Sequence, residues 1–175
     1  STAHRISPEW VYGFPEMTKG QAELIKKAKR VANPGCYPTG AISLVRPLIE
    51  NSIIPSSYPL TINAVSGYSG GGKSLIKRFE TEENEAPPIY FYGTNLSHKH
   101  LPEMQQYIGL DNPPFFIPSV GKYMHGMIVQ VPIYLTESLN TANRPQTIHD
   151  VLSQHYDSSN FVTVNPLDTA RTPVE

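Results

Sequence analysis

The sequence predicts an α+β domain in which helices pack on a mixed, mostly antiparallel sheet. Segments of strand length and of helix length follow one another along the 175 residues, without an internal repeat. The 17 prolines fall in turn-like sequences such as NPGCYP, which indicates many short elements and argues against a helical bundle. In residues 127–135 apolar side chains alternate with others, as in a strand that buries one face.

The N-terminal part of the chain is expected to be extended or rich in turns over residues 1–17. Thr18 and Gln21 have the spacing of a capping box, which predicts a helix over residues 21–30. Three apolar residues share one face of that helix: Leu24, Ile25 and Ala28.

A short strand at residues 31–32 leads into the tight turn NPGCYPTG, which carries Cys36. A helix is expected to begin near Pro38 and to run to residue 50, since proline is favoured in a first helical turn. Pro47 should bend this helix or mark its last turn.

The rest of the chain alternates between further strands and helices. Strands are expected at residues 60–66, 89–93, 115–120, 127–135 and 161–164. A helix is expected from Leu101 onwards, and a last helix should cover residues 148–156. Thr147 and Asp150 would cap that last helix. The acidic run in residues 77–86 should be a solvated loop or a short helix.

Charge and composition exclude several kinds of partner. The formal net charge is −1 and the basic residues are scattered, so no surface for a nucleic-acid backbone is expected. No apolar run approaches the roughly 18–20 residues of a membrane span, and no signal-peptide pattern opens the chain. A single cysteine, Cys36, fits a reducing compartment, so a cytoplasmic location is expected.

The stretch SGYSGGGKS contains the Walker A pattern, with Gly67, Gly72, Lys73 and Ser74 at the required spacing. A nucleoside triphosphatase also needs a second apolar strand that ends in aspartate, and no such segment follows. Its parallel strands would be continuously apolar, whereas the longest strand expected here alternates. We therefore expect a glycine-rich turn whose backbone amides could hold an anion such as a substrate phosphate.

Cys36 and a histidine-rich segment are the candidates for chemistry. Cys36 lies where a strand turns into a helix, and the positive end of the helix would favour thiolate. A lone cysteine is also commonly buried and inert, and the sequence leaves both alternatives open. In HKHLPE, His98 could act as a base, with Glu103 holding its imidazole in one tautomer. His98 and His100 could also bind a metal, but no further cysteine or histidine pairs support a zinc site.

Three motifs in this order carry a family resemblance: NPGCYPTGA, SGYSGGGKS and HKHLPEM. Together with STAHR and WVYGFPE, they resemble the N-acetyl-γ-glutamyl-phosphate reductases of arginine biosynthesis, in particular the shorter, second type. The match covers nearly the whole chain. It implies a fold like the C-terminal domain of glyceraldehyde-3-phosphate dehydrogenase-type enzymes, and it assigns the glycine-rich loop to a reductase.

The resemblance also implies a mechanism. Cys36 would attack the γ-acyl carbon of N-acetylglutamyl phosphate and expel phosphate, and hydride from NADPH would reduce the thioester to N-acetylglutamate semialdehyde. His98 would be the general acid and base, supported by Glu103. Four further residues would line the substrate site: Ser66, Gly67, Tyr92 and His100. No metal is implied.

The resembling family binds its dinucleotide in a Rossmann domain, and this chain has no G-x-G-x-x-G turn that opens a βαβ unit. Residues 1–33 are therefore expected to be a lead-in segment and connecting helix from a missing dinucleotide-binding domain. Residues 34–175 would form the catalytic, substrate-binding and subunit-contact domain, without its C-terminal part. We expect the missing domain to bind most of NADP, the protein to form a homo-oligomer, and the fragment alone to be inactive.

Three alternatives remain open at this point. The substrate could be a related acyl phosphate, aminoadipyl or aspartyl, since aspartate-semialdehyde dehydrogenase shares the fold and the cysteine chemistry. A Cys–His hydrolase of the protease type would need no cofactor domain. The chain could also be a non-catalytic interaction domain in which the strand at residues 127–135 forms an oligomer interface.

Overall fold

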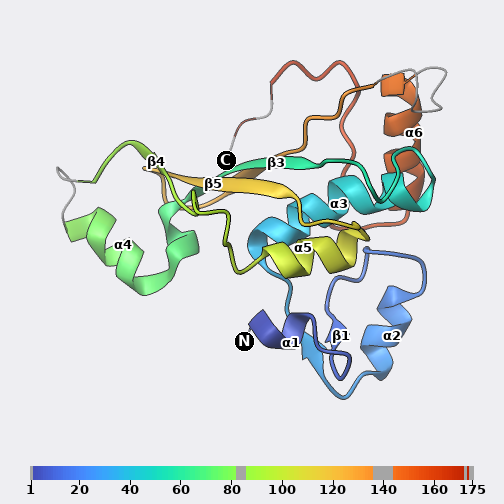
Figure 1. Ribbon diagram of the computed structural model, residues 1–175, viewed down its shortest axis with the longest axis horizontal. Helices are drawn as coiled ribbons and strands as arrows, with labels where there is room; N and C mark the ends of the chain where they lie inside the picture. The colour runs from blue at the N-terminus through green and yellow to red at the C-terminus, as the bar shows by residue number, and fades with distance from the viewer. Residues whose placement is uncertain (1, 82–85, 136–143, 172, 174–175) are drawn as a thin grey trace.

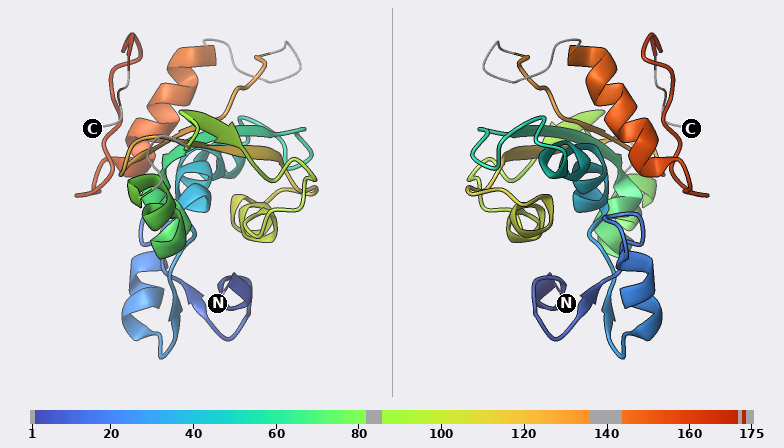
Figure 2. Two further views of the ribbon diagram at one scale, coloured as in Figure 1. Left: turned by 90° about the vertical axis from the view of Figure 1, so that its left-hand side faces the viewer. Right: turned by 90° about the vertical axis from the view of Figure 1, so that its right-hand side faces the viewer.

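The computed structural model describes residues 2–81, 86–135, 144–171 and 173. These residues form a four-stranded sheet, helices that cover one of its faces, and a smaller N-terminal unit (Figure 1). Figure 2 shows two of these helices, at residues 36–50 and 101–108, between the sheet and the N-terminal unit. The α+β class expected from the sequence is confirmed.

The main sheet has the strand order β4–β5–β3–β6. Its strands are β3 (Thr61–Gly67), β4 (Ile89–Phe91), β5 (Phe115–Gly121) and β6 (Met127–Gln130). The central pair, β3 and β5, is parallel, whereas β4 with β5 and β3 with β6 are antiparallel. The sheet is therefore mixed, and most of its pairings are antiparallel, as expected.

Helix α3 (Cys36–Glu50) and helix α5 (Leu101–Ile108) cover one face of this sheet. The core between them holds Ala41, Ile42, Val45, Leu48, Ile62, Met104, Ile108 and Phe116. Because successive strand residues point to opposite faces, the other face carries half-buried and exposed side chains. We call it the open sheet face, and its half-buried and exposed side chains include Thr61, Asn63, Val65, Phe115, Ile117 and Ile128.

Two further helical segments flank the sheet. Beyond β3 the chain forms a 3₁₀ turn, η1 (Tyr68–Gly71), and then helix α4 (Gly72–Thr81). Helix α6 (Arg144–Tyr156) packs on α3, and the Tyr156 hydroxyl donates a hydrogen bond of 2.8 Å to the Ser43 carbonyl.

The N-terminal unit is a small βαβ arrangement. It consists of α1 (Thr2–Arg5), β1 (Val11–Tyr12), α2 (Gln21–Lys27) and β2 (Val31–Ala32). Strands β1 and β2 pair in parallel, and the chain passes from β2 through Asn33, Pro34 and Gly35 directly into α3.

Helix α3 forms where the sequence predicts it. The side chain of Thr39 donates to the Gly35 carbonyl over 2.9 Å and so closes the first turn. Pro47 lies in the last turn, three residues before the helix ends at Glu50, in agreement with the expected end.

The N-terminal elements differ from the expectation in two ways. Residues 1–17 contain α1 and β1, which were not expected. The capping box does not form, because the residue that caps α2 is Gly20, in a left-handed conformation with φ of +87°. The Gln21 side chain is buried and donates to the Tyr12 carbonyl instead, so it ties the helix to β1. Leu24, on the expected apolar face, is exposed.

Two strand predictions in the C-terminal part were wrong. Strand β6 ends at Gln130 and not at residue 135, and Pro132 has no N–H group with which to continue the ladder. Residues 161–164 form no strand, because the Ser159 hydroxyl accepts the backbone N–H groups of Phe161 and Val162 in a turn.

The caps of the last helix differ from the expectation, whereas the first half of the acidic run is helical, one of the two forms expected. Thr147 and Asp150 lie inside α6 and are not its caps, and Asp150 accepts a hydrogen bond from Gln146 one turn earlier. The acidic run begins inside α4, while residues 82–85 lie outside the described residues. Within the described part of the chain, no helix is long and apolar enough to cross a membrane.

Candidate active site

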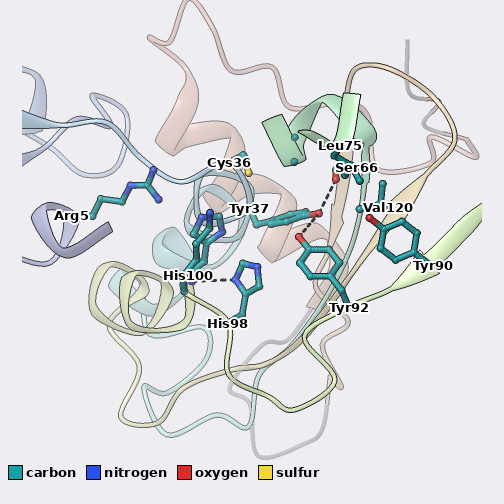
Figure 3. A pocket seen from close by; sticks show the side chains of 13 residues that line it. Arg5, Cys36, Tyr37, Ser66, Leu75, Tyr90, Tyr92, His98, His100 and Val120 are labelled. Atoms are coloured by element: carbon teal, nitrogen blue, oxygen red, sulfur yellow. Dashed lines mark hydrogen bonds between the residues drawn. The ribbon is translucent and has the colours of Figure 1, made fainter. Parts of the chain in front are cut away.

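One pocket with a volume of about 540 Å³ brings together distant parts of the chain (Figure 3). It is lined from α1, the first turn of α3, β3 with η1 and α4, β4 and the loop before α5. Its polar lining includes Arg5, Cys36, Tyr37, Ser66, His98 and Lys99.

Cys36 is exposed, lines this pocket and is the first residue of α3. It therefore lies at the N-terminus of a 15-residue helix, whose partial positive charge interacts favourably with an anion. The turn before it is crowded, because a Cβ atom at Gly35 would lie 2.8 Å from both Glu103 Oε2 and His100 Nε2. Glycine at this position lets α3 start directly against the loop that carries the histidines.

His98 is half-buried and lines the same pocket. Its Nδ1 accepts a hydrogen bond of 3.2 Å from the backbone N–H of His100. Burial, and to a smaller extent the neighbouring Lys99, lowers the pKa of His98 below its usual value. The ring is thus neutral near pH 7, and since Nδ1 is the acceptor, its proton is on Nε2.

His100 is buried and lines the pocket. Its Nε2 atom lies against Gly35, the residue that precedes Cys36. Burial lowers the pKa of His100 to about 3, with smaller contributions from His98, Arg5 and Lys99. Its Nδ1 atom has no hydrogen-bond partner within the described part of the chain.

Glu103 does not hold His98, contrary to the expectation. Its side chain is buried on α5, where Oε1 accepts the Tyr12 hydroxyl and the Gly35 N–H, both at 2.7 Å. Oε2 accepts the Arg5 guanidinium at 3.3 Å. The carboxylate therefore joins α1, β1 and the turn that precedes Cys36. The expected task of this carboxylate was to hold the His98 imidazole in one tautomer. The backbone N–H of His100 does so instead, by its hydrogen bond to His98 Nδ1.

Ser66 and Tyr92 both line the pocket, and Tyr37 connects them. The Tyr37 hydroxyl lies 2.8 Å from Ser66 Oγ and accepts a hydrogen bond of 3.3 Å from the Tyr92 hydroxyl (Figure 3). Gly67, in contrast, does not line the pocket. It packs against the following loop, where a Cβ atom would lie 2.5 Å from the Met124 carbonyl oxygen.

The pocket residues that the sequence analysis did not name include Arg5, Tyr37 and Lys99. Tyr37 and Lys99 are neighbours of Cys36 and His98, so their proximity could have suggested them. Arg5 had no local signal, because it meets Glu103 across 98 positions of the chain.

The Walker A residues do not form a triphosphate site. Gly70 and Gly71 line the pocket, but Lys73 and Ser74 are exposed on the first turn of α4. Strand β5, parallel to β3, ends at Gly121 and is followed by Lys122 instead of an aspartate. No group of three or more metal-ligating side chains occurs within the described residues.

Comparison with known proteins gives one family match and a set of close relatives. The family model described as semialdehyde dehydrogenase, dimerisation domain, matches residues 36–173. An N-acetyl-gamma-glutamyl-phosphate reductase of Rhizobium meliloti is 53% identical over 171 residues, which are 96% of this chain and 55% of that protein. One from Brucella suis is 51% identical over 177 residues, 99% of this chain and 57% of that protein.

The chain thus spans little more than half the length of the curated relatives it matches. The family match begins at Cys36, which is the first residue of α3 and lines the pocket. It continues through β6 and α6. On this match, the chain belongs to the semialdehyde dehydrogenase dimerisation-domain family.

Proposed function

We propose that this chain is the catalytic and subunit-contact part of a reductase that converts N-acetyl-γ-glutamyl phosphate into N-acetylglutamate semialdehyde and phosphate. The observation that carries the proposal is a pocket lined by an exposed cysteine at a helix N-terminus, by His98 and by the cationic side chains of Arg5 and Lys99. The two relatives named above carry the same activity in their names.

Cys36 is the proposed nucleophile. Its sulfur attacks the γ-acyl carbon, a bond forms between sulfur and carbon, and the carbon–oxygen bond to phosphate breaks. The product is a thioester on Cys36 and free phosphate. Thiolate is a good nucleophile and also a good leaving group, so the same side chain can release the aldehyde after reduction.

Arg5 and Lys99 are the proposed partners of the substrate's negative charges. Both line the pocket with Cys36, and guanidinium and ammonium groups bind phosphate and carboxylate. Arg5 is held in place by its hydrogen bonds to the Asn33 carbonyl and to Glu103. The expelled phosphate would leave from this cationic end.

His98 is the proposed acid and base at the acyl carbon. In the tautomer selected by the His100 amide, its Nε2 carries the proton and can donate to oxygen as negative charge develops there. If the Nε2 proton has passed to the oxygen of the hemithioacetal, the same nitrogen takes it back on collapse, as the carbon–sulfur bond breaks and Cys36 leaves as thiolate. His100 and Tyr92 are proposed to line the substrate site beside it.

The described residues do not fit a dinucleotide. The parallel unit β1–α2–β2 has no glycine-rich turn of the G-x-G-x-x-G type after β1, where a pyrophosphate would be held. We therefore propose that NADPH, the source of the hydride, is bound mainly by another part of the longer protein. Residues 1–33 would form the connection to that part, and residues 34–175 the catalytic and subunit-contact domain.

The proposed protein is a cytoplasmic homo-oligomer. A nucleophilic thiol must stay reduced, which the cytoplasm provides. On the open sheet face Val65 pairs with Ile128, and Ile117 lies on the neighbouring strand opposite Asn63, a composition suited to contact with a second copy. The matching family model is itself described as a dimerisation domain.

The experiment traps the thioester. Full-length protein is mixed with N-acetylglutamyl phosphate without NADPH, and phosphate release and the mass of the Cys36 peptide are measured. We expect one equivalent of phosphate and an acyl adduct on Cys36, and then aldehyde when NADPH is added. In Cys36→Ser, turnover should fall by about 10⁴-fold or more.

The same experiment separates the alternatives. Continuous phosphate release without NADPH, with free acid as the product, would identify a hydrolase. An adduct that forms faster with the aminoadipyl or aspartyl phosphate would identify a reductase of a related substrate. A protein that forms no adduct with any of the three would leave the chain as an interaction domain.

A further inference from the structure

Three hydroxyl groups, two of them on buried side chains, form a cluster at one end of the pocket. We call Tyr37, Ser66 and Tyr92 the hydroxyl cluster. The Tyr37 side chain is its centre, since its hydroxyl contacts Ser66 Oγ at 2.8 Å, the Tyr92 hydroxyl at 3.3 Å and the Ser119 carbonyl at 3.4 Å. Tyr37 and Ser66 are almost fully buried, yet both line the pocket.

The protons of this cluster can be arranged in two ways. Tyr92 donates to Tyr37, and Tyr37 can then donate either to Ser66 or to the Ser119 carbonyl. In the first arrangement the Ser66 proton is free for a ligand. In the second arrangement Ser66 donates to Tyr37 and offers only its lone pairs. The cluster can therefore act as a hydrogen-bond donor or acceptor toward a ligand without gaining a charge.

The charged side chains that line the pocket are all cationic. Arg5 and Lys99 are its cations, and none of the residues that line it is aspartate or glutamate. Glu103 lies behind the Gly35 turn, where its oxygens bind Tyr12, Gly35 and Arg5. Figure 3 shows Arg5 on one side of Tyr37, with Ser66 and Tyr92 on the other. The pocket thus has a cationic end and a neutral hydroxyl end.

We propose that the hydroxyl cluster recognises the amide of an N-acylated substrate and makes the pocket reject the same substrate with a free ammonium group. This inference rests on the proposed function and identifies the residues that would set its specificity. An amide presents one carbonyl acceptor and one N–H donor, both neutral, which is what the two proton arrangements of the cluster can match.

An ammonium group is unfavourable at the same place for two reasons. On entering the pocket the ammonium group would lose its hydration, and no carboxylate lines the pocket to pair with it. Burial of such an unpaired charge is costly. The ammonium group would also be repelled by Arg5 and Lys99, which are needed for the two anionic groups of the substrate. Discrimination against the free amine is thus built from repulsion as well as from the hydrogen bonds of the cluster.

The test is a binding experiment on the full-length protein with three probes: N-acetyl-L-glutamate, glutarate and L-glutamate. Titration calorimetry should give the tightest binding for N-acetyl-L-glutamate and the weakest for L-glutamate. Ser66→Ala and Tyr37→Phe should each weaken binding of N-acetyl-L-glutamate by about 5–30-fold, as loss of one or two hydrogen bonds implies. Binding of glutarate, which has no amide, should stay within about twofold.

Tyr68→Phe is the matched control. Tyr68 lies just beyond Ser66, stacks on Phe79 at 4.9 Å and does not line the pocket. The Tyr68→Phe protein should bind all three probes with the same affinities as the wild type. Thermal unfolding of each variant checks that the fold is kept.

Equal losses for N-acetyl-L-glutamate and glutarate would overturn the proposal, because they would mean that the cluster only supports the shape of the pocket. Tight binding of L-glutamate would overturn it as well. Selective loss of N-acetyl-L-glutamate binding would support it even if the protein formed no thioester, in which case the proposed reduction alone would fail.

Discussion

Glu103 shows how one buried carboxylate can organise a site without lying among the residues that line it. It accepts hydrogen bonds from α1, β1 and the Gly35 turn, so three segments far apart in the chain converge on two oxygen atoms. The Gly35 N–H directly precedes the first residue of α3. The carboxylate therefore sets where the helix begins and where the thiol of Cys36 is presented.

Replacement of Glu103 by glutamine should be strongly destabilising. The amide would bring an NH₂ group toward Arg5 or toward the donors of Tyr12 and Gly35, and would leave the Arg5 guanidinium without its ion pair. We expect the free energy of unfolding to fall by about 3 kcal/mol in urea denaturation. Glu23→Gln, which breaks an exposed pair with Lys26, should cost less than about 0.5 kcal/mol. Similar losses in the two variants would contradict this account of Glu103.

His100 should make the stability depend on pH. In the unfolded chain its imidazole takes up a proton near pH 6.5, whereas in the folded protein it does so only near pH 3. Between these values the unfolded state binds more protons, so the free energy of unfolding falls as the pH falls, by about 1.4 kcal/mol per unit. Above pH 6.5 the contribution is fully present.

Denaturation of wild type and His100→Asn at about pH 7 and about pH 5 measures this effect. The wild type should lose about 2 kcal/mol more than the variant between the two conditions. A change at exposed His125, to asparagine, should leave the wild-type dependence in place. A His100→Asn protein with the wild-type slope would show that another group is responsible.

At the scale of the elements, α3 performs two tasks. Its first turn presents Cys36 and Tyr37 to the pocket, and its body packs on the sheet through Ala41, Ile42 and Val45. Close approach to the sheet depends on Gly40, where a Cβ atom would lie 2.8 Å from Val129 Cγ2 on β6. The position of the thiol is thus coupled to the distance between α3 and β6.

Gly40→Ala should therefore destabilise the protein although alanine is the better helix former. Overpacking against the stiff Val129 side chain should cost about 1–3 kcal/mol, partly offset by a gain of up to about 1 kcal/mol in helix propensity. Val129→Ala removes the clashing methyl groups, so the double variant should regain part of the loss. A double-mutant cycle that gives no coupling energy would show that the helix does not press on Val129.

At the scale of the whole molecule, the sheet divides the fold into a covered face and an open one. Helices α3 and α5 cover one side, while Val65, Ile117 and Ile128 lie on the other. Phe91 on the edge strand β4 is also largely exposed. Such a surface suits the proposed contact with a second copy.

Ile117→Lys in the full-length protein should weaken self-association by at least about 10-fold, since a charge would enter the centre of the contact. Sedimentation at several concentrations measures the effect. Leu24→Lys is the control, because Leu24 is exposed on α2 in the N-terminal unit. An unchanged oligomer in Ile117→Lys would place the subunit contact elsewhere.

Much of the fold could be predicted because its signals are local. Turn chemistry around NPGCYP positioned Cys36 at the start of a helix, and Pro47 marked the end of that helix. Apolar segments predicted β3, β4, β5 and α5 in approximately the correct places. The strand predictions at residues 131–135 and 161–164 failed, because a strand needs a partner ladder that an alternating or apolar pattern does not guarantee.

The sequence by itself determined which residues could do chemistry: one cysteine at a helix start and a histidine in an H-x-H motif, to which the family resemblance added Ser66 at the end of a strand. Only the tertiary structure decided how they are supported. It paired Glu103 with Arg5 and Tyr12 instead of with His98, and it placed Tyr37 between Ser66 and Tyr92. These contacts span 29 to 98 positions, and hydrogen bonds between such distant groups depend on the packing of whole elements, which local sequence patterns do not encode.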